Sequence, residues 1–377
     1  MNNLDLGTIV LAAGGTGGHI FPAEAVARAL DSRGYKIILI TDKLKARFPG
    51  ALSDVDTYKI NASGLVGKSV FQKILSLKEL CFGFFQARGY LNKVCPKAVV
   101  GFGGYVSFPT ILAARAAGYR CAIHEQNVIF GCANRFLSRI VDKVATSFMN
   151  SQGVPKNLDS KLVYTGMPVR SIFLNARKTP FPLFDPATPI VLLVLGGSQG
   201  ARILSQVVPK ALSLLDKKLK VRLKVVQQCR AEDLAIVRSI YNAAGISANL
   251  ASFFENVSIH MSEANLVIAR AGASTIAELT VVGCPAILVP YGGMADHHQS
   301  LNARAFESTG AGWVLPEEEF TASCLKDHIQ LLLGKPSLLK IAAESSRKTG
   351  RPDAALRLAD LISKLGVTDK KGPRSIV

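Results

Sequence analysis

The feature that most limits the possible folds is a strand, a glycine loop and a helix in succession, which occurs once in each half of the chain. In the first half an apolar run at 8–13 leads into the glycine loop at 14–19 and then into a helical pattern. In the second half the run at 190–195 leads into the loop at 196–202 in the same way. This succession is typical of doubly wound parallel sheets. We therefore predict an α/β protein with two Rossmann-like, doubly wound domains.

Apolar, β-rich runs alternate with helical patterns along most of the chain, as in βαβ units. The predicted strands are 8–13, 36–41, 98–101, 121–124, 190–195, 222–227, 265–268 and 285–290. The prolines concentrated between 168 and 189 indicate a linker, which places an N-terminal domain at 1–168 and a C-terminal domain at 169–349. A helical pattern at about 350–366 is expected to pack back on the N-terminal domain.

The composition excludes several classes of protein. A hydrophobic content of 49% excludes a disordered polycation, although the net charge of +18 favours an acidic partner. The longest uncharged run, 6–23, contains several glycines and a proline, so no transmembrane helix is predicted.

The N-terminus lacks the features of a secretory signal, and the expected location is cytoplasmic. The seven cysteines form no CxxC pair and are expected to be reduced thiols.

The first glycine loop has the composition of a phosphate-binding turn. Its glycines let backbone N–H groups approach an anion at the N-terminus of the following helix. The spacing is not GxGxxG, which argues against a dinucleotide cofactor. His19 ends this loop and is either a structural hydrogen-bonding residue or a general base for the bound substrate.

The second half offers further candidate ligands after its strands. Glu278 lies in the motif RAGASTIAE at 270–278 and could accept hydrogen bonds from a ribose diol, or could complement a helix dipole from the first turn. Asp296, His297 and His298 are adjacent, and adjacent side chains on a loop point apart, so no metal site is predicted.

Six motifs occur in a fixed order and together resemble one family. They are GGTGGH at 14–19, GFGGYVS at 101–107, HEQN at 124–127, GGSQGAR at 196–202, RAGASTIAE at 270–278 and DHHQSLNA at 296–303. The set closely resembles the MurG family of peptidoglycan N-acetylglucosaminyltransferases over nearly the whole chain. The resemblance implies the GT-B architecture, in which two Rossmann-like domains face each other across a cleft, with the donor in the C-terminal domain and a lipid-linked acceptor in the N-terminal one.

The resemblance also implies a reaction and its participants. N-acetylglucosamine would pass, with inversion, from UDP-N-acetylglucosamine to the 4-hydroxyl of N-acetylmuramyl-(pentapeptide)-pyrophosphoryl-undecaprenol, called lipid I, to give lipid II. The enzyme would use no cofactor and no metal. It would act as a peripheral protein on the cytoplasmic face of the inner membrane.

Site residues are implied position by position. The implied contacts to the sugar nucleotide are Thr16, Gly17, Gly18, Asn127, Arg170, Ser198, the backbone of Phe254 at the uracil, Glu278 at the ribose, and Gln299. The implied acceptor contacts are Gly15, Gly103, Gly104 and Tyr105. His19 is the expected catalytic base, with Glu125 as the alternative. The chain departs from the family pattern at His298, which replaces one of two adjacent glutamines, and in the segment 252–255, which is only loosely similar.

A basic, apolar segment in the first half suggests a membrane contact. Between 57 and 124 there are nine basic residues and one acidic residue. Within it, apolar residues recur at helical spacing at Val70, Phe71, Ile74, Leu77, Cys81, Phe84 and Phe85. A helix with an apolar face and a basic rim is typical of binding to an anionic membrane surface. The alternative is that the apolar stripe belongs to the protein core.

Two other functions are compatible with parts of this pattern. A non-hydrolysing UDP-N-acetylglucosamine 2-epimerase would share the fold and the sugar nucleotide, but it would need neither a lipid acceptor nor a membrane face. A nucleic-acid-binding protein would explain the charge, but no RNA-binding or helix-turn-helix motif is present, so we expect no nucleic-acid partner.

Overall fold

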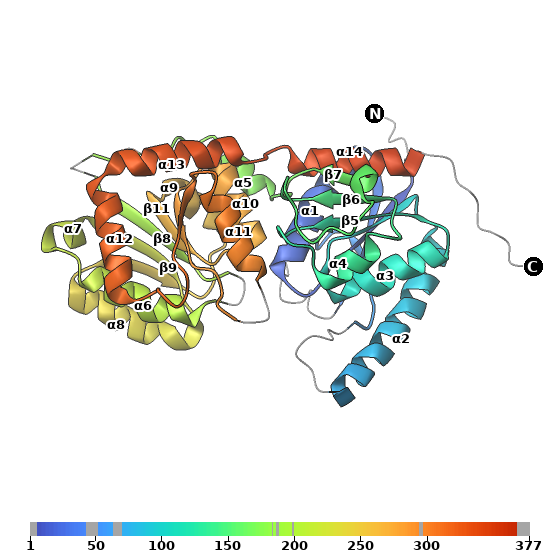
Figure 1. Ribbon diagram of the computed structural model, residues 1–377, viewed down its shortest axis with the longest axis horizontal. Coiled ribbons are helices and arrows are strands. Elements are labelled where there is room, and N and C mark those ends of the chain that lie inside the picture. Colours follow the sequence, from blue (N-terminus) through green and yellow to red (C-terminus); the bar gives the residue numbers. More distant parts are fainter. Residues whose placement is uncertain are drawn as a thin grey trace, which may run out of the picture. The chain divides into compact units, whose positions relative to one another are not determined.

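The computed structural model describes residues 6–42, 52–62, 70–182, 184–185, 188–197, 200–293 and 297–367, and for 70–74 and 367 it describes the backbone only. The chain forms two compact units. Unit 1 comprises Met1–Arg170 and Pro352–Val377, and unit 2 comprises Ser171–Arg351. Figure 1 shows the elements of both units. The predicted class, two doubly wound α/β units with parallel sheets, is confirmed.

The sheet of unit 1 has, in the described residues, seven parallel strands in the order β3-β2-β1-β4-β5-β6-β7. Their bounds are β1 (Thr8–Ala12), β2 (Lys36–Thr41), β3 (Asp56–Lys59), β4 (Ala98–Gly101), β5 (Arg120–Glu125), β6 (Lys143–Thr146) and β7 (Leu162–Tyr164). The sequence predicted β1, β2, β4 and β5. It missed β3, β6 and β7, which are short, and β3 and β7 are edge strands without a fully buried residue.

Helices cover both faces of this sheet. Successive side chains of a strand point to opposite faces, and in these strands both sets are apolar. Ile9 and Leu11 share one core with α1 (Gly17–Asp31) and α14 (Ala354–Val367). Val10 and Ala12 lie in a second core with the other helices. Those helices are α2 (Val70–Val94), α3 (Gly104–Ala116) and α4 (Cys132–Leu137), and a short 3-10 turn, η2 (Asp159–Lys161), precedes β7. Burial on both faces is the usual state of a parallel sheet.

The last helix of the described chain, α14, belongs to the core of unit 1. Leu358, Ala359 and Ile362 are fully buried in the same core as Ile9. An ion pair of 2.7 Å between Arg33 and Asp360 joins the helix to the end of α1. The chain therefore returns to unit 1 after completing unit 2.

The sheet of unit 2 has, within the described part, six parallel strands in the order β10-β9-β8-β11-β12-β13. They are β8 (Ile190–Leu195), β9 (Leu223–Gln228), β10 (Ser247–Ala251), β11 (Leu266–Ala269), β12 (Ala286–Leu288) and β13 (Gly312–Val314). The helices are α5 (Ser171–Ala176), α6 (Arg202–Ser213), α7 (Lys217–Arg222), α8 (Leu234–Ala244), α9 (Val257–Glu263), α10 (Ala273–Val282), α11 (His298–Glu307), α12 (Ala322–Gly334) and α13 (Pro336–Thr349), with a 3-10 turn, η3 (Ala231–Asp233). The sequence missed both edge strands, β10 and β13.

Helix α2 packs on the rest of unit 1 through a narrow face that consists mostly of small residues. Ser76, Gly83 and Ala87 are buried, and the helix packs against α3. A Cβ on Gly83 would lie 2.1 Å from the backbone oxygen of Asn61, so the helix backbone is in direct contact with the segment after β3. Leu91, which continues this face at helical spacing, is fully buried as well, whereas Leu75, Leu77, Phe82 and Phe85 are exposed.

The predicted apolar stripe of α2 is only partly in the core. Phe84 is half-buried and packs against the core of unit 1. In contrast, Leu77, Cys81 and Phe85 are exposed, which contradicts the alternative that the whole stripe is core. The side chains of Val70, Phe71 and Ile74 lie outside the described residues. None of the helices described is both long enough and apolar enough to cross a membrane.

Two glycines of α2 test this close packing. Gly83→Ala is expected to lower the free energy of unfolding by about 1–3 kcal/mol, because the added methyl group would overlap the Asn61 carbonyl. Gly89→Ala is the matched control, since a Cβ there would meet nothing within 4 Å, and it should raise the stability by about 0.5–1 kcal/mol. Urea titrations of both variants measure the difference. An unchanged free energy of unfolding in Gly83→Ala would contradict the contact.

Candidate functional site

The strand order of each sheet reverses at one point, and the predicted loops flank that point. In unit 1 the strand β1 has β2 on one side and β4 on the other, so the loops after β1 and β4 are neighbours. In unit 2 the loops after β8 and β11 have the same relation. Ligands of doubly wound sheets bind outside the carboxyl ends of the strands at such a point. Each unit thus places its glycine loop where a ligand is expected.

His19 lies in the first turn of α1, and one nitrogen of its ring is hydrogen-bonded to the glycine loop. Its Nδ1 is 3.1 Å from the carbonyl oxygen of Gly14 and 3.3 Å from Oγ1 of Thr16. A carbonyl oxygen can only accept, so in the neutral ring the proton resides on Nδ1 and Nε2 carries the free lone pair. Burial lowers the pKa of His19 from its usual 6.5 and outweighs the Gly14 hydrogen bond and the charge of Asp42, which both raise it. The ring is therefore neutral at pH 7, with Nε2 able to accept a proton.

The loop after β4 packs directly on this histidine. Gly103 and Gly104 have φ values of 86° and 73°, a region that favours glycine. A Cβ on Gly103 would lie 2.9 Å from Cδ2 of His19, and one on Gly104 would lie 2.7 Å from the carbonyl oxygen of Gly14. The structure thus brings these predicted acceptor residues into contact with the predicted base. Tyr105 follows on α3 and is exposed, and the Cβ position of Gly15 is open.

The carboxylate of Glu125 is occupied by hydrogen bonds within unit 1. Its Oε1 accepts from the backbone N–H of Asn127 at 3.0 Å and from that residue's Nδ2 at 3.4 Å. Its Oε2 accepts from the backbone of Gly131 at 3.1 Å and from Nδ2 of Asn134 at 2.8 Å. The side chain therefore closes the turn between β5 and α4. This geometry favours His19 over Glu125 as the base, and the sequence did not reveal it because two of the donors lie beyond the motif.

The neighbours of Glu125 in the same motif also hold the site loops in place. His124 is fully buried, and burial lowers its pKa to about 4. Its Nε2 is 3.2 Å from the carbonyl oxygen of Gly166, which fixes the segment leading to Arg170. Nε2 of Gln126 donates to the carbonyl of Phe102, next to the Gly103 turn.

Thr16 and Arg170 both lie near the start of α1. Thr16 is the N-cap residue, directly before Gly17 and Gly18, the first two residues of the helix. The guanidinium of Arg170 lies over the ring of Phe21, 4.1 Å from its centroid. Arg170 is the last residue of unit 1, so the structure brings a predicted sugar-nucleotide contact to the same helix as the glycine loop.

The glycine loop of unit 2 is tightly wound. A Cβ on Gly196 would lie 2.5 Å from the backbone nitrogen of Ala201, and Gly197 and Gly200 have φ values of 79° and 68°. Ser198, a predicted donor contact, lies outside the described residues.

A residue that the sequence analysis missed, Gln228, joins the loops after β8 and β10 at this edge. Its Oε1 accepts from the backbone of Gly196 at 3.2 Å, and its Nε2 donates to the carbonyls of Gly197 at 3.1 Å and Ser252 at 3.2 Å. Its amide directly follows the predicted strand 222–227, and this position at the end of an apolar run is the sequence signal that could have identified it.

The remaining predicted residues of unit 2 lie at the same carboxyl edge or on the helices that follow it. Phe254 follows β10, and its ring contacts His260 edge-on at 5.1 Å between centroids. Glu278 is half-buried on α10, whose first turn contains no acidic residue, so the alternative of a first-turn acid is wrong. Gln299 lies in the first turn of α11, where its Oε1 accepts from the backbone N–H of Tyr291 at 3.1 Å.

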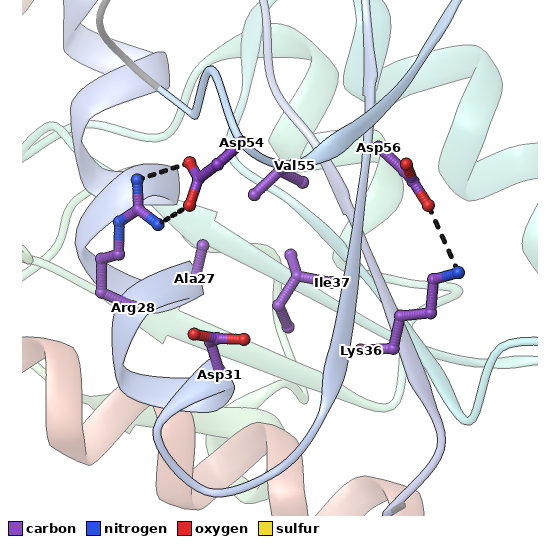
Figure 2. A pocket seen from close by; sticks show the side chains of 8 residues that line it. All are labelled: Ala27, Arg28, Asp31, Lys36, Ile37, Asp54, Val55 and Asp56. Carbon is purple, nitrogen blue, oxygen red and sulfur yellow. Dashed lines mark hydrogen bonds and ion pairs between the residues drawn. The ribbon is translucent and has the colours of Figure 1, made fainter.

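Among the described residues no group of three or more His, Cys, Asp and Glu side chains could hold a metal ion, and Asp296 is not among them. A surface pocket of unit 1 lies at the opposite edge of the sheet (Figure 2), where β2 and β3 begin. Four of its charged side chains form ion pairs, Arg28 with Asp54 at 2.5 Å and Lys36 with Asp56 at 3.3 Å. No residue that lines it belongs to a glycine loop.

Comparisons with known proteins agree with this arrangement. Residues 9–146 match the glycosyltransferase family 28 N-terminal domain, and residues 191–358 match the glycosyltransferase family 28 C-terminal domain. A UDP-N-acetylglucosamine–N-acetylmuramyl-(pentapeptide) pyrophosphoryl-undecaprenol N-acetylglucosamine transferase from Paramagnetospirillum magneticum is 50% identical and is aligned over 94% of this chain and 95% of its own length.

Solved structures extend the comparison to the fold. The crystal structure of Acinetobacter baumannii MurG has a TM-score of 0.76 and 30% identity, and the match covers 95% of this chain and 99% of that one. A Neisseria meningitidis UDP-GlcNAc 2-epimerase has a TM-score of 0.68 but only 14% identity, over 95% of this chain and 100% of that one, which indicates a shared fold alone. From its two matched domains and its identity to relatives over nearly its full length, the chain is a glycosyltransferase that belongs to the MurG family.

Proposed function

We propose that this enzyme transfers N-acetylglucosamine from UDP-N-acetylglucosamine to the 4-hydroxyl of the N-acetylmuramyl residue of lipid I, which yields lipid II for peptidoglycan synthesis. The observation that carries the proposal is the 50% identity to a transferase named for this donor and acceptor, over nearly the whole of both chains. The likeness to the epimerase is limited to the fold and does not favour epimerisation.

In the proposed reaction His19 is the general base. The acceptor hydroxyl gives its proton to Nε2 while its oxygen attacks the anomeric carbon, and UDP leaves from the opposite face, so the configuration inverts. An alcohol is a weak nucleophile, and a neutral imidazole within hydrogen-bond reach removes its proton as the bond forms. The hydrogen bond from Nδ1 to Gly14 supports this role, because it fixes both the tautomer and the ring orientation.

The acceptor and donor contacts follow the loops described above. We assign the acceptor to Gly15, Gly103, Gly104 and Tyr105, beside the base. The sugar nucleotide is assigned to Thr16, Gly17, Gly18, Asn127, Arg170, Ser198, Phe254, Glu278 and Gln299. Backbone N–H groups at the start of α1 and the cation of Arg170 would stabilise the leaving diphosphate. No step in this scheme requires a metal ion or a cofactor.

We also propose that unit 1 binds the anionic surface of the inner membrane from its cytoplasmic face. The outward face of α2 carries Leu75, Lys78, Phe82 and Phe85, at helical spacing. Phe82 and Phe85 are 64% and 68% exposed. Exposed aromatic residues among lysines are typical of interfacial helices, and each Lys or Arg near an anionic surface contributes about 1 kcal/mol. A membrane contact would bring the enzyme to a lipid-linked acceptor.

A transfer assay tests the proposed function. The purified enzyme, incubated with UDP-N-acetylglucosamine and lipid I, should form lipid II with one new β-linked N-acetylglucosamine, read by mass spectrometry and NMR. UDP-N-acetylmannosamine formed in the absence of lipid I would indicate an epimerase and overturn the proposal.

The base assignment predicts the effect of removing His19. His19→Ala should lower kcat by about 10²–10⁴-fold, with the affinity for UDP-N-acetylglucosamine within a few-fold of wild type. The base must be unprotonated, and the pKa of His19 is lowered, so the wild-type rate should be constant near pH 7–8 and should fall only as the pH drops below about 6.5. Stopped rate assays from pH 5 to 9 measure both effects. An unchanged kcat in His19→Ala would reject the assignment.

The membrane assignment predicts different effects for the two exposed phenylalanines of α2 and for the one that packs against the core. Replacing Phe82 and Phe85 with Ser should reduce cosedimentation with phosphatidylglycerol vesicles several-fold and should leave the melting temperature nearly unchanged, because both rings are exposed. Phe84→Ser is the control, since this ring packs against the core and its loss should lower the melting temperature. Unaltered vesicle binding by the Phe82 and Phe85 variant would count against the proposed surface.

A further inference from the structure

We propose that Glu317 is a positioning residue for the sugar nucleotide, acting through Gln299. The inference rests on the proposed function, in which Gln299 contacts the donor. Glu317 lies just beyond β13, outside every motif found in the sequence. It is far from Gln299 in sequence, and a chain of contacts at the carboxyl edge of unit 2 connects the two.

The first link is a partly buried ion pair. Oε2 of Glu317 lies 2.6 Å from Nη1 of Arg270, and the two side chains are 29% and 12% exposed. The same guanidinium nitrogen donates to the carbonyl oxygens of Val289 at 3.2 Å and Pro290 at 3.1 Å. A charge-assisted hydrogen bond with little exposure to water is among the stronger contacts in a protein. Arg270 therefore ties the end of β11 to the segment after β12, and Glu317 holds Arg270.

The second link joins the carboxylate directly to the turn after β12. The backbone N–H of Gly292 donates to the same Oε2 of Glu317 at 3.2 Å. The Tyr291 ring faces the guanidinium of Arg270 at 5.5 Å. A Cβ on Gly293 would lie 2.4 Å from this ring, so glycine is required for the turn to fold over it. The turn is thus held on both sides of Tyr291.

The third link orients the amide of Gln299. The backbone N–H of Tyr291 donates to Gln299 at 3.1 Å, so the accepting atom is the oxygen, Oε1. The opposite end of the amide, Nε2, then presents two N–H donors from the half-buried first turn of α11. Within the described part of the chain this nitrogen donates to no protein acceptor. Two directed donors at the ligand edge of the sheet suit the hydroxyl or phosphate oxygens of a sugar nucleotide.

These contacts explain how Glu317 would position the Gln299 amide. If its charge is lost, Arg270 and the Gly292 N–H each lose a strong acceptor, and the turn that bears Tyr291 becomes less ordered. The Gln299 amide then loses its fixed orientation, and donor binding must supply the ordering that the free protein no longer provides. Affinity for the donor should fall although Glu317 itself does not touch it.

A double-mutant cycle distinguishes this role from a general structural one. Glu317→Gln and Gln299→Ala are made singly and together, and the Kd for UDP-N-acetylglucosamine is measured by calorimetry. Each single variant should weaken binding by about tenfold. In the Gln299→Ala background, the further change from Glu317→Gln should be less than about twofold, because the residue through which it acts is gone. Glu318→Gln, an exposed neighbour, is the matched control and should leave the Kd unchanged.

Three results would overturn the inference. They are an unchanged Kd in Glu317→Gln, an unchanged Kd in Gln299→Ala, and an equal loss from Glu317→Gln in both backgrounds, which would indicate general loosening of unit 2. The transfer assay on the wild-type enzyme reports separately on the proposed function. Normal transfer together with any of these results rejects the role of Glu317 alone. Donor binding without transfer to lipid I rejects the proposed function, and the cycle still reports on Glu317.

Discussion

The close approach of two backbone segments, after β1 and after β4, is the constraint on which the candidate site of unit 1 depends. The strands pair in parallel register, with Ala12 opposite Gly101, so their loops leave the sheet side by side. Gly104 then lies where any Cβ would overlap the Gly14 carbonyl, and Gly103 lies against the ring of His19. The orientation of His19 is therefore set by backbone atoms, which move less than side chains. A base held in this way is oriented before the substrate arrives.

A second principle recurs at the carboxyl edges of both sheets. Glu125, Gln228 and Glu317 each stand at or just beyond the end of a strand, and each accepts backbone N–H groups from neighbouring loops. Buried or half-buried polar groups need such partners, because leaving them unpaired costs free energy comparable to a lost hydrogen bond. The loops that bear the predicted ligand contacts are thus held in place by polar side chains at the strand ends. Two of these side chains, Gln228 and Glu317, lie outside every motif, so residues beyond the motifs matter to the site.

Sequence patterns were informative where burial is strong and failed where packing decides. The central strands were predicted because their runs of Val, Ile and Leu are buried on both faces. The edge strands β3, β7, β10 and β13 were missed, since pairing with one neighbour stabilises them and their own composition does not distinguish them. The short inner strand β6 was missed as well. Helix α2 is a clearer failure. Hydrophobicity alone ranks Phe85 above Ala87 as a core residue, yet the smaller residue is buried because the helix backbone lies against the Asn61 carbonyl.

The sequence by itself determined the two doubly wound units, the positions of both glycine loops and the family, because these depend on local periodicity and on short motifs. Only the tertiary structure decided which candidate base has an available lone pair. Gly131 and Asn134 saturate Glu125 from a following turn, whereas Nε2 of His19 stays free because Nδ1 is bound to Gly14. It also decided that Glu317 reaches Arg270 across the intervening strand β12. Hydrogen-bond partners and close packing join residues that are distant along the chain, and a periodic pattern carries no record of them.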